Sequence, residues 1–395
     1  MGLGAALFFA PLAAWPQGDP SAPAELVEKT EILLGEVSRL SGLPIRREVP
    51  VEFEAPEFFE RYYRRRLESQ YPPARAAACQ KAYEFLGFLA PGQDLIPTYL
   101  GSFLGSVAGL YDPDTQTVYL AGGEDPDRLD RVLVHELTHA LQDQSFSLKD
   151  YFGAEGGQSM DRQFARDSLV EGQAVAVSED YESLSRDKGL IDASGKTGPQ
   201  AEGGEEAGPW GPGAVDFPYA YGAAFFRACR KENPGLSLKD LFARPPGTTR
   251  EILHPGDYGR PVGEPARSGP RDWESDKIWE DELGEYGLFL LARQGEPEGE
   301  AWAAVRGWRG DQVRLYEDPQ SRRLWLAGWV GMESPSQAGR FYESCRRRLA
   351  KKYPTGAARV YWSRSGDQVF WAEGLASAQA ADFKRWAGQK NPSRE

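Results

Sequence analysis

The sequence predicts an α+β protein: a mainly helical core with a short β-hairpin, followed by a C-terminal domain of two β-β-α units. Apolar residues recur at helical spacing through most of the first 260 residues. Short runs rich in β-branched and aromatic residues gather after residue 300 and alternate with helical patterns. Stretches rich in glycine and proline separate these parts, and 395 residues are enough for two or three domains.

Charge and hydropathy exclude several classes of protein. The chain has 46 basic and 59 acidic side chains, and a net charge of −13 argues against nucleic acid as a partner. No later segment holds 18 uninterrupted apolar residues, so we expect no integral membrane segment. The three cysteines are far apart and form no Cys-x-x-Cys pair, which argues against a thiolate zinc site.

Residues 1–24 form either a secretory signal peptide or a disordered tail. The run MGLGAALFFAPLAA resembles the apolar part of a signal and is followed by a stretch rich in proline and alanine. This favours export to the periplasm or the extracellular space. No Lys or Arg precedes Lys29, so the usual basic start of a signal is missing and a cytoplasmic location stays open.

The next region, 25–104, is predicted to be helical. Helical spacing runs through Glu25–Leu40, Pro56–Ser69 and Ala74–Leu89, and Pro72-Pro73 breaks the pattern between the last two. This region is either a packing domain or an inhibitory prodomain, and its sequence supports no functional assignment.

Residues 105–260 are predicted to form the catalytic domain. A β-hairpin over Ala108–Leu120 turns at Asp112-Pro113, where proline presets the bend. A helix follows, and a second long helix covers Asp161–Leu184. The segment 187–216 lacks periodicity and is rich in Gly, Pro and Glu, which indicates a flexible insertion. Helical pattern returns at Phe217–Phe242, and Pro255–Pro270 is a plausible domain boundary.

Residues 271–395 are predicted to form the C-terminal α+β domain. Its expected strands and helices alternate as two β-β-α units: Val313–Tyr316, Leu324–Val330, Pro335–Lys351, then Arg359–Trp362, Val369–Ala372, Ser377–Ala387. A weak repeat, Gly-Asp-Gln-Val at 310–313 and again at 366–369, suggests that the units are related. Its many tryptophans are expected to form core, because each buries a large apolar area.

The strongest chemical signal is His135-Glu136-Leu137-Thr138-His139. Residues four apart lie on one face of a helix, so both histidines can hold one metal ion from adjacent turns. Neutral imidazoles suit Zn²⁺, and we expect one zinc per chain. Glu136 lies close to the open coordination position, where it can take a proton from water and pass it to a leaving amine. The alternative is that both histidines are polar residues on a solvent-facing side of the helix and bind no metal.

Glu171 is the expected third ligand. It is a charge inside the apolar helical run Leu169–Val175, and a buried carboxylate must be paired or bind a metal. The small Gly172 and Ala174 are expected to let this helix approach the motif helix closely. An ordinary surface glutamate is the alternative.

The third histidine, His254, lies in Ile252-Leu253-His254-Pro255 and has three open roles. It is a candidate ligand in place of Glu171, a candidate donor to the oxyanion on the attacked carbonyl, or a structural residue before a proline.

Other candidates come from position alone. Tyr219, Tyr221 and Tyr258 are candidates for oxyanion stabilisation, although a packed aromatic residue with a hydrogen-bonded hydroxyl is the favoured interpretation of each. Asp143 lies four residues after His139, and Asp167 lies four before Glu171, so either can orient a ligand imidazole from behind. Both are equally compatible with solvated helix positions.

The stretches HELTHALQDQ (135–144) and SLVEGQA (168–174) resemble zincin metalloproteases of the gluzincin type, in which the third ligand is a glutamate on a following helix. The spacing from His139 to Glu171 is 32 positions (171 − 139), longer than in the thermolysin-like branch, and Val170 stands where that branch has asparagine. A closer resemblance is to a poorly characterised group of exported bacterial proteins. These share HELTHALQDQ, LVEG, Phe-Pro-Tyr (217–219) and Ile-Leu-His-Pro (252–255).

This resemblance implies a zincin-like fold with His135, His139 and Glu171 on zinc and Glu136 as the base. It raises His254 as a site residue, and it implies that a strand near Val118 holds an extended substrate by edge pairing. The expected function is therefore a zinc metallopeptidase acting on peptides or proteins. The alternatives are a catalytically weak zincin that serves as an envelope scaffold, and a zinc amidase acting on non-protein amides.

Overall fold

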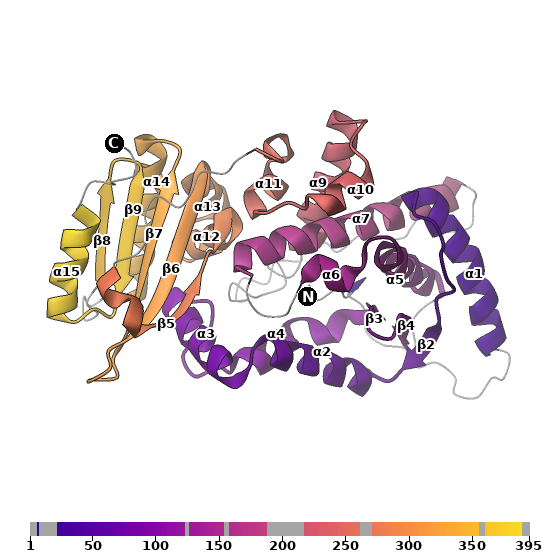
Figure 1. The fold of residues 1–395 in the computed structure, drawn as a ribbon, viewed down its shortest axis with the longest axis horizontal. Coiled ribbons are helices and arrows are strands. Elements are labelled where there is room, and N and C mark those ends of the chain that lie inside the picture. The colour runs from indigo at the N-terminus through magenta and orange to yellow at the C-terminus, as the bar shows by residue number, and fades with distance from the viewer. Residues whose placement is uncertain are drawn as a thin grey trace.

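The computed structural model describes residues 6–7, 22–122, 126–153, 158–187, 217–260, 271–354 and 360–388, and the chain has the α+β fold that its sequence predicts. Helices of the N-terminal part occupy one end of the molecule and the C-terminal sheet occupies the other (Figure 1). The expected insertion at 187–216 and most of the expected tail at 1–24 lie outside the described residues. None of the helices described is both long and apolar enough to cross a membrane, as expected.

The region 25–104 is mainly helical, as predicted, but it also contributes a strand. Its elements are α1 (Ala22–Ser41), β2 (Val51–Glu54), α2 (Pro56–Gln70), α3 (Pro73–Leu86), α4 (Leu95–Phe103) and a 3₁₀ turn, η1 (Leu104–Ser106). The short strand β2 and helix α4 were not expected. Leu33 and Val37 of α1 lie in one apolar cluster with Val132 and Leu133 of the motif helix. This region and the motif helix therefore share one core.

The predicted hairpin is confirmed as β3 (Val107–Asp112) and β4 (Thr117–Ala121), which pair antiparallel. The sheet has the order β1-β3-β4-β2, in which β1 (Ala6–Leu7) runs antiparallel to β3 and β2 runs parallel to β4. The expectation that the strand near Val118 offers a free edge is wrong, because β4 has a partner on each side. Strand β3 likewise lies between β1 and β4, so the outer strands of this sheet among the described residues are β1 and β2.

Between the hairpin and residue 260, the described residues form the helices α5 (Pro126–Phe146), α6 (Leu148–Phe152), α7 (Met160–Asp187), α9 (Phe217–Glu232), α10 (Leu238–Ala243) and α11 (Thr249–Leu253). A 3₁₀ turn, η2 (Pro255–Asp257), ends this part. The long second helix is confirmed as α7. The helical pattern expected over Phe217–Phe242 is confirmed as α9 and α10, which a turn at Pro234-Gly235 separates; Ser237 caps the start of α10 in a capping box with Asp240.

The C-terminal part contains the two predicted β-β-α units. They are β6 (Trp308–Glu317), β7 (Leu324–Met332) and α14 (Pro335–Lys352), then β8 (Val360–Ser365), β9 (Gln368–Glu373) and α15 (Ser377–Gly388). Before them come η3 (Arg271–Asp276), β5 (Lys277–Asp281), α12 (Gly284–Arg293) and α13 (Glu298–Val305), which complete a sheet of order β5-β6-β7-β9-β8. The Gly-Asp-Gln-Val repeat does not mark equivalent positions. Its first copy lies in the first strand of unit one and its second copy leads into the second strand of unit two.

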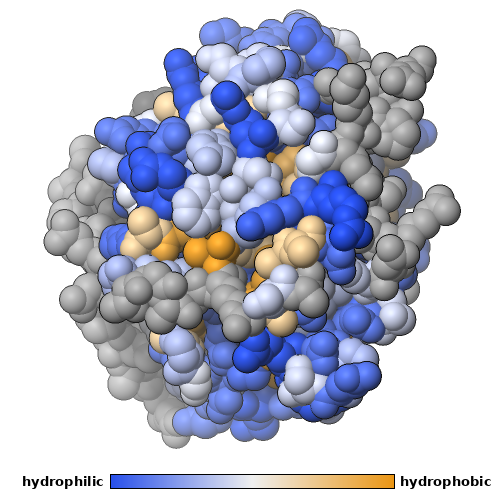
Figure 2. All heavy atoms as spheres, turned by 90° about the vertical axis from the view of Figure 1, so that its left-hand side faces the viewer, coloured by the Kyte–Doolittle hydropathy of each residue, from blue (hydrophilic) through white to orange (hydrophobic). Residues whose placement is uncertain are grey.

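The tryptophans of the C-terminal sheet are core, as predicted. Side chains alternate along β7, so Trp325 and Trp329 join a cluster under α15, whereas Leu326 and Val330 face the main core. Each of the two tryptophans is 1% exposed. The end of the molecule that carries α15 is correspondingly mostly hydrophilic at its surface, with a small apolar area (Figure 2). Cys79, Cys229 and Cys345 are buried and free.

A buried charge cluster joins the N-terminal helices to the C-terminal sheet. Arg348 of α14 donates to Glu373 of β9 at 2.9–3.0 Å, and these side chains are 1% and 0% exposed. The same guanidinium donates to the carbonyl oxygens of Phe85 and Leu86 at the end of α3, at 3.3 and 3.4 Å. Lys352 adds a second cation at 2.6 Å from Glu373. Buried ions persist only when they are matched in this way, so the cluster fixes α3 against the sheet.

Three aspartates lie where the start of α7 meets β5, β6 and α12; Asp161 and Asp311 are buried, and Asp281 is half-buried. Asp161 accepts from the backbone N–H and the hydroxyl of Thr249, Asp281 from the N–H of Met160 and Glu282, and Asp311 from the N–H of Leu283 and Gly284. Burial raises the pKa of all three carboxyl groups, to about 7 for Asp281 and Asp311. These groups therefore hold protons in the folded chain at pH values where the unfolded chain releases them.

We expect the junction to lose stability as pH rises. A carboxyl group whose pKa is higher in the folded state stabilises below its unfolded pKa, and this contribution is lost as pH rises through the folded value near 7. One such proton changes the free energy of unfolding by about 1.4 kcal/mol per pH unit between the two pKa values. Asp281→Asn keeps an acceptor oxygen for both N–H groups and removes the titration. Urea unfolding at pH 5 and pH 8 should therefore show a smaller loss of stability in this variant.

The exposed Asp382, which pairs with Arg385 on α15, provides the control. Asp382→Asn should keep the wild-type difference between the two pH values. An Asp281→Asn protein with the full wild-type difference would contradict the assignment.

Candidate metal centre

Helix α5 presents His135 and His139 on one face, as their spacing predicts. The helix is apolar on its other sides, and Val132, Leu133, Leu137 and Leu141 are 0% exposed. The two histidines are only 2% and 3% exposed. Imidazoles at this depth require polar partners, so the solvent-facing alternative is wrong.

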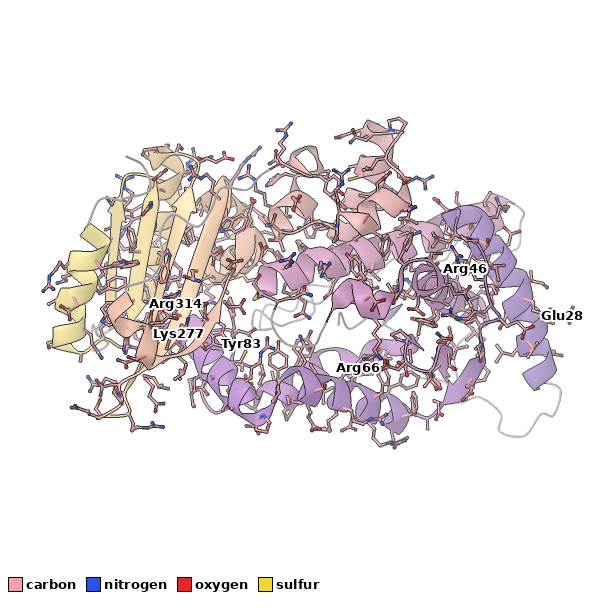
Figure 3. The ribbon with its side chains drawn as sticks, in the orientation of Figure 1. Glu28, Arg46, Arg66, Tyr83, Lys277 and Arg314 are labelled. Atoms are coloured by element: carbon pink, nitrogen blue, oxygen red, sulfur yellow. The ribbon has the colours of Figure 1, made fainter. Side chains whose placement is uncertain are left out.

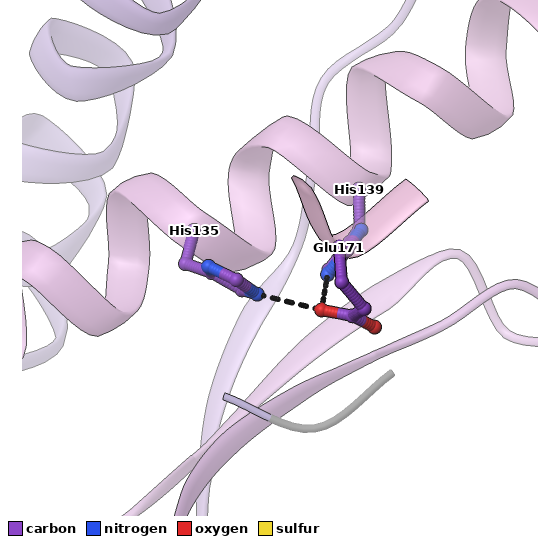
Figure 4. A group of neighbouring side chains, drawn as sticks. All are labelled: His135, His139 and Glu171. Atoms are coloured by element: carbon purple, nitrogen blue, oxygen red, sulfur yellow. Dashed lines mark hydrogen bonds and ion pairs between the residues drawn. The ribbon is translucent and has the colours of Figure 1, made fainter. Parts of the chain in front are cut away.

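The partner of both rings is Glu171 of α7. Its Oε2 atom lies 3.1 Å from Nε2 of His135 and 3.4 Å from Nε2 of His139 (Figure 4). Glu171 is itself 3% exposed, so the expectation of a buried carboxylate is confirmed. Two imidazole nitrogens and one carboxylate oxygen therefore converge on one point from adjacent helices.

The spacing of these atoms fits a metal ion. Zinc bonds of about 2.0–2.1 Å in a tetrahedron place neighbouring ligand atoms roughly 3.3 Å apart. In the described part of the chain, His135, His139 and Glu171 are the one group of three such side chains whose ligand atoms all lie within 4.8 Å of one another. Two neutral imidazoles with one carboxylate suit Zn²⁺ and leave a fourth position open.

Gln142 fixes which nitrogen of His139 faces the site. Its Oε1 atom lies 2.8 Å from Nδ1 of His139, while its amide group donates to the carbonyl of Val170 and to Gln173, each at 2.9 Å. Because the amide N–H groups of Gln142 are used, its oxygen accepts a hydrogen bond from Nδ1–H of His139. The Nε2 atom of His139 is then the one with a lone pair toward Glu171. This is the outer hydrogen bond that metal-binding histidines usually make.

The charges of the site are strongly coupled. Burial lowers the pKa of His135 and would lower that of His139, but the adjacent carboxylate of Glu171 raises the pKa of His139 to about 9. Burial opposes ionisation of Glu171, yet the neighbouring histidines hold its pKa at about 2. Glu171 is therefore ionised at neutral pH, and its site favours one cation. A metal ion bound by these three side chains would take the place of the proton that His139 otherwise carries.

Glu136 lies beside this group and is fully buried, with 0% of its surface exposed. Its negative charge contributes to the raised pKa of His139 and to that of Tyr63 of α2. The carboxylate of the expected base therefore lies near one ligand ring and near a phenol from another part of the chain.

Two tyrosines border the site. Tyr63 is 1% exposed, and burial together with the charges of Glu136 and Glu171 raises the pKa of its phenol well above the usual value. It therefore stays a neutral hydrogen-bond donor. Tyr219 of α9, a predicted candidate, stacks on His135 with ring centroids 6.1 Å apart. Tyr63 lay outside the predicted site because its helix resembles an ordinary packing helix.

Glycine sets the distance between α7 and α9. A Cβ atom on Gly172 would lie 2.1 Å from the backbone of Gly222, and one on Gly222 would lie 2.2 Å from the carbonyl oxygen of Ser168. No side chain fits there. Gly172 does allow a close approach, but to α9 rather than to the motif helix as expected. This contact places Tyr219 opposite the helix that carries Glu171.

The two aspartates predicted to orient an imidazole lie in other surroundings. Asp143 accepts from Arg47, from the Tyr111 hydroxyl and from the N–H of Leu148, each at 2.9 Å, so it ties α5 to its surroundings. The side chain that contacts the outer nitrogen of His139 is Gln142 and not Asp143. Asp167 lies one turn before Glu171 and makes no hydrogen bond to either histidine in the described structure.

The remaining candidates lie in other surroundings. Nε2 of His254 lies 2.9 Å from Glu285 of α12, a side chain that is 2% exposed, so its partner is a carboxylate of the C-terminal part. Tyr258 donates to the carbonyl of Arg244 and meets Phe225 edge-on. Tyr221 stacks on Phe217 in the main core. Of the tyrosines proposed from the sequence, Tyr219 is the one with a ring against a ligand histidine.

No protein-family model matches this chain, and a search of curated proteins returns no match. The functional conclusion therefore rests on the geometry and chemistry of the site itself.

Proposed function

We propose that this protein is a zinc metallopeptidase of the zincin type, with His135, His139 and Glu171 as ligands and Glu136 as general base. One observation carries the proposal: the three candidate ligand atoms lie within 4.8 Å of one another next to a fully buried glutamate. A purely structural zinc site has no use for a base at this position. Retention of Glu136 therefore favours an enzyme over an envelope scaffold.

The chemistry follows from the residues. Zinc, when bound, polarises a carbonyl group and lowers the pKa of a water molecule. Glu136 takes the proton of that water and delivers it to the nitrogen that leaves. The phenols of Tyr63 and Tyr219 are the nearby neutral donors available to the oxygen that becomes negative. The buried surroundings exclude bulk water and strengthen these interactions.

The first sheet favours a peptide as the substrate. Strand β1 pairs antiparallel with β3, with Ala6 opposite Gly109, and it also contacts α5. An extended substrate chain would therefore lie beside the motif helix in the place along β3 that β1 occupies. Backbone pairing of this kind holds peptides regardless of their side chains. A small non-protein amide has no backbone to use this edge.

Cleavage of a denatured-protein peptide library tests the function. We expect zinc-loaded protein to cut it, protein treated with a chelator to lose the cuts, and added zinc to restore them. Mass spectrometry of the products measures all three states. Restored activity on small amides alone would instead identify an amidase. An absence of zinc-dependent hydrolysis on either panel would overturn the proposal in favour of a binding protein.

A further inference from the structure

A cavity of about 770 Å³ lies where the N-terminal helices, α7 and β5 meet. Its wall includes Tyr71 and Tyr83 of the N-terminal part, Trp279 of β5 and Asp167 of α7. Figure 3 places Tyr83 at this junction, close to β5 with Lys277. The volume suits a large side chain with part of its backbone.

The carboxylates of the wall differ in how they are matched. Glu280 pairs with Arg314 and Lys277, and Asp281 accepts two backbone N–H groups. The charge of Arg162 and a hydrogen bond from Ser159 act on Glu282. Asp167 is the exception: its Oδ1 atom is buried and has no hydrogen-bond partner among the described residues.

No cation of the wall neutralises Asp167 directly. Arg75 donates to the carbonyl of Gln70 and stands over the ring of Tyr71 at 5.3 Å. Arg166, the chain neighbour of Asp167, places its guanidinium over Tyr151 at 4.8 Å. Burial raises the pKa of Asp167 to about 7, the negative charge of Glu171 adds to the rise, and the charge of the neighbouring Arg166 opposes it. A carboxylate with one buried oxygen that lacks a hydrogen-bond partner is stabilised by a positive group.

The cavity lies one helical turn of α7 from the candidate metal centre, and none of the three candidate ligands lines it. Asp167 precedes Glu171 by four residues, which is one helical turn or roughly 6 Å along α7. An extended peptide advances about 3.3 Å per residue. A group bound at Asp167 would therefore belong to a residue one or two positions from the cleaved bond.

We propose that this cavity binds a cationic group of the peptide substrate, with Asp167 as its counter-charge. This inference rests on the proposed peptidase function. The cation is either a lysine or arginine side chain or the free amino terminus of a short peptide. The aromatic rings of Tyr71, Tyr83 and Trp279 favour the same ligand, because cations bind well to aromatic faces.

The test uses matched peptides and two readouts. Peptides that carry lysine, norleucine or glutamate beside the cleaved bond are prepared with free and with acetylated amino termini. For each peptide, kcat/KM is measured with the zinc-loaded wild type. Kd is measured by calorimetry with zinc-loaded Glu136→Gln, which should bind the peptide without cutting it. We expect lysine to be favoured over norleucine by roughly 10-fold or more in both readouts, as a buried charge-assisted pair provides. Loss of binding on acetylation would assign the cation to the amino terminus instead.

Variants assign the preference to its residue. Asp167→Asn should reduce the lysine-to-norleucine ratio to about one in both backgrounds. The control Glu280→Gln alters a wall carboxylate that already has its own cations, and it should keep the preference. The inference would be overturned if Asp167→Asn kept the lysine preference. It would also be overturned if the wild type bound norleucine peptides as tightly as lysine peptides, whether their amino termini were free or acetylated.

The two proposals fail separately. Peptide cleavage without a cation preference would leave the peptidase and remove the pocket. A lysine preference in binding that depends on Asp167, without any cleavage by wild type, would leave the pocket and remove the peptidase.

Discussion

Glu136→Gln should abolish hydrolysis while the protein keeps its zinc. Glutamine has nearly the same shape as glutamate but cannot accept a proton from water, and general base catalysis typically contributes about 10²–10⁴-fold to the rate. Glu136 is not among the three converging ligands, so metal content should stay at the wild-type level. Peptide hydrolysis and atomic absorption on the same sample measure both quantities.

The separation of the two readouts makes this experiment informative. Loss of zinc in the variant would show that Glu136 helps to hold the metal. Wild-type activity would show that another group acts as the base. A melting temperature close to that of wild type is needed as the control, because Glu136 is fully buried and its neighbours include His139.

Glu171→Ala should lower zinc affinity further than the loss of an outer partner does, which typically costs roughly 10–100-fold. The change removes a direct ligand atom and the one carboxylate in the group. His135 and His139 alone then provide two neutral nitrogens, which rarely suffice for zinc. Competition with a chromophoric chelator measures the affinity, and activity should fall with it.

His254→Gln is the matched control, because it tests the other candidate for third ligand. His254 pairs with Glu285 and lies outside the converging group, so its replacement should leave zinc affinity unchanged. A strong effect of His254→Gln together with a weak effect of Glu171→Ala would exchange their roles.

The central site was predictable because its geometry is local. His135, Glu136 and His139 occupy one helix, where spacing alone determines which side chains share a face. Glu171 was predictable for a different reason, since a charge within an apolar run needs a buried partner. Most helices were likewise visible as 3.6-residue periodicity, which depends on short stretches of chain.

The outer partners were not predictable, because they depend on how distant segments meet. Asp143 has the right spacing from His139, yet Arg47 and Tyr111 hold its side chain elsewhere. Gln142 contacts the outer nitrogen of His139 instead. Its other two partners, Val170 and Gln173, lie on α7, so the arrangement depends on how α5 and α7 pack together. Tyr63 lies 72 positions before His135 in the chain (135 − 63), so no local pattern connects it to the site.

Missed elements have equally physical causes. Strand β2 has only four residues, too few for a period of two to stand out. Helix α12 is buried on nearly all sides, with nine of its ten residues inside, so it has no polar face and no amphipathic pattern. Secondary structure that is set by tertiary burial leaves a weak trace in the sequence.

The cluster around Arg348 bears on how such a chain can be divided or recombined. A fragment that began after Arg348 would keep Glu373 without its guanidinium, and one that began after Leu86 would deprive that guanidinium of two carbonyl acceptors. The first cut would leave Glu373 with Lys352 as its one cation in the cluster, and the second would leave the Arg348–Glu373 pair without two of its acceptors; breaking a buried ion pair typically costs about 3–5 kcal/mol. The C-terminal sheet is thus a poor candidate for exchange between unrelated proteins, and we expect the two halves to be inherited, expressed and crystallised together.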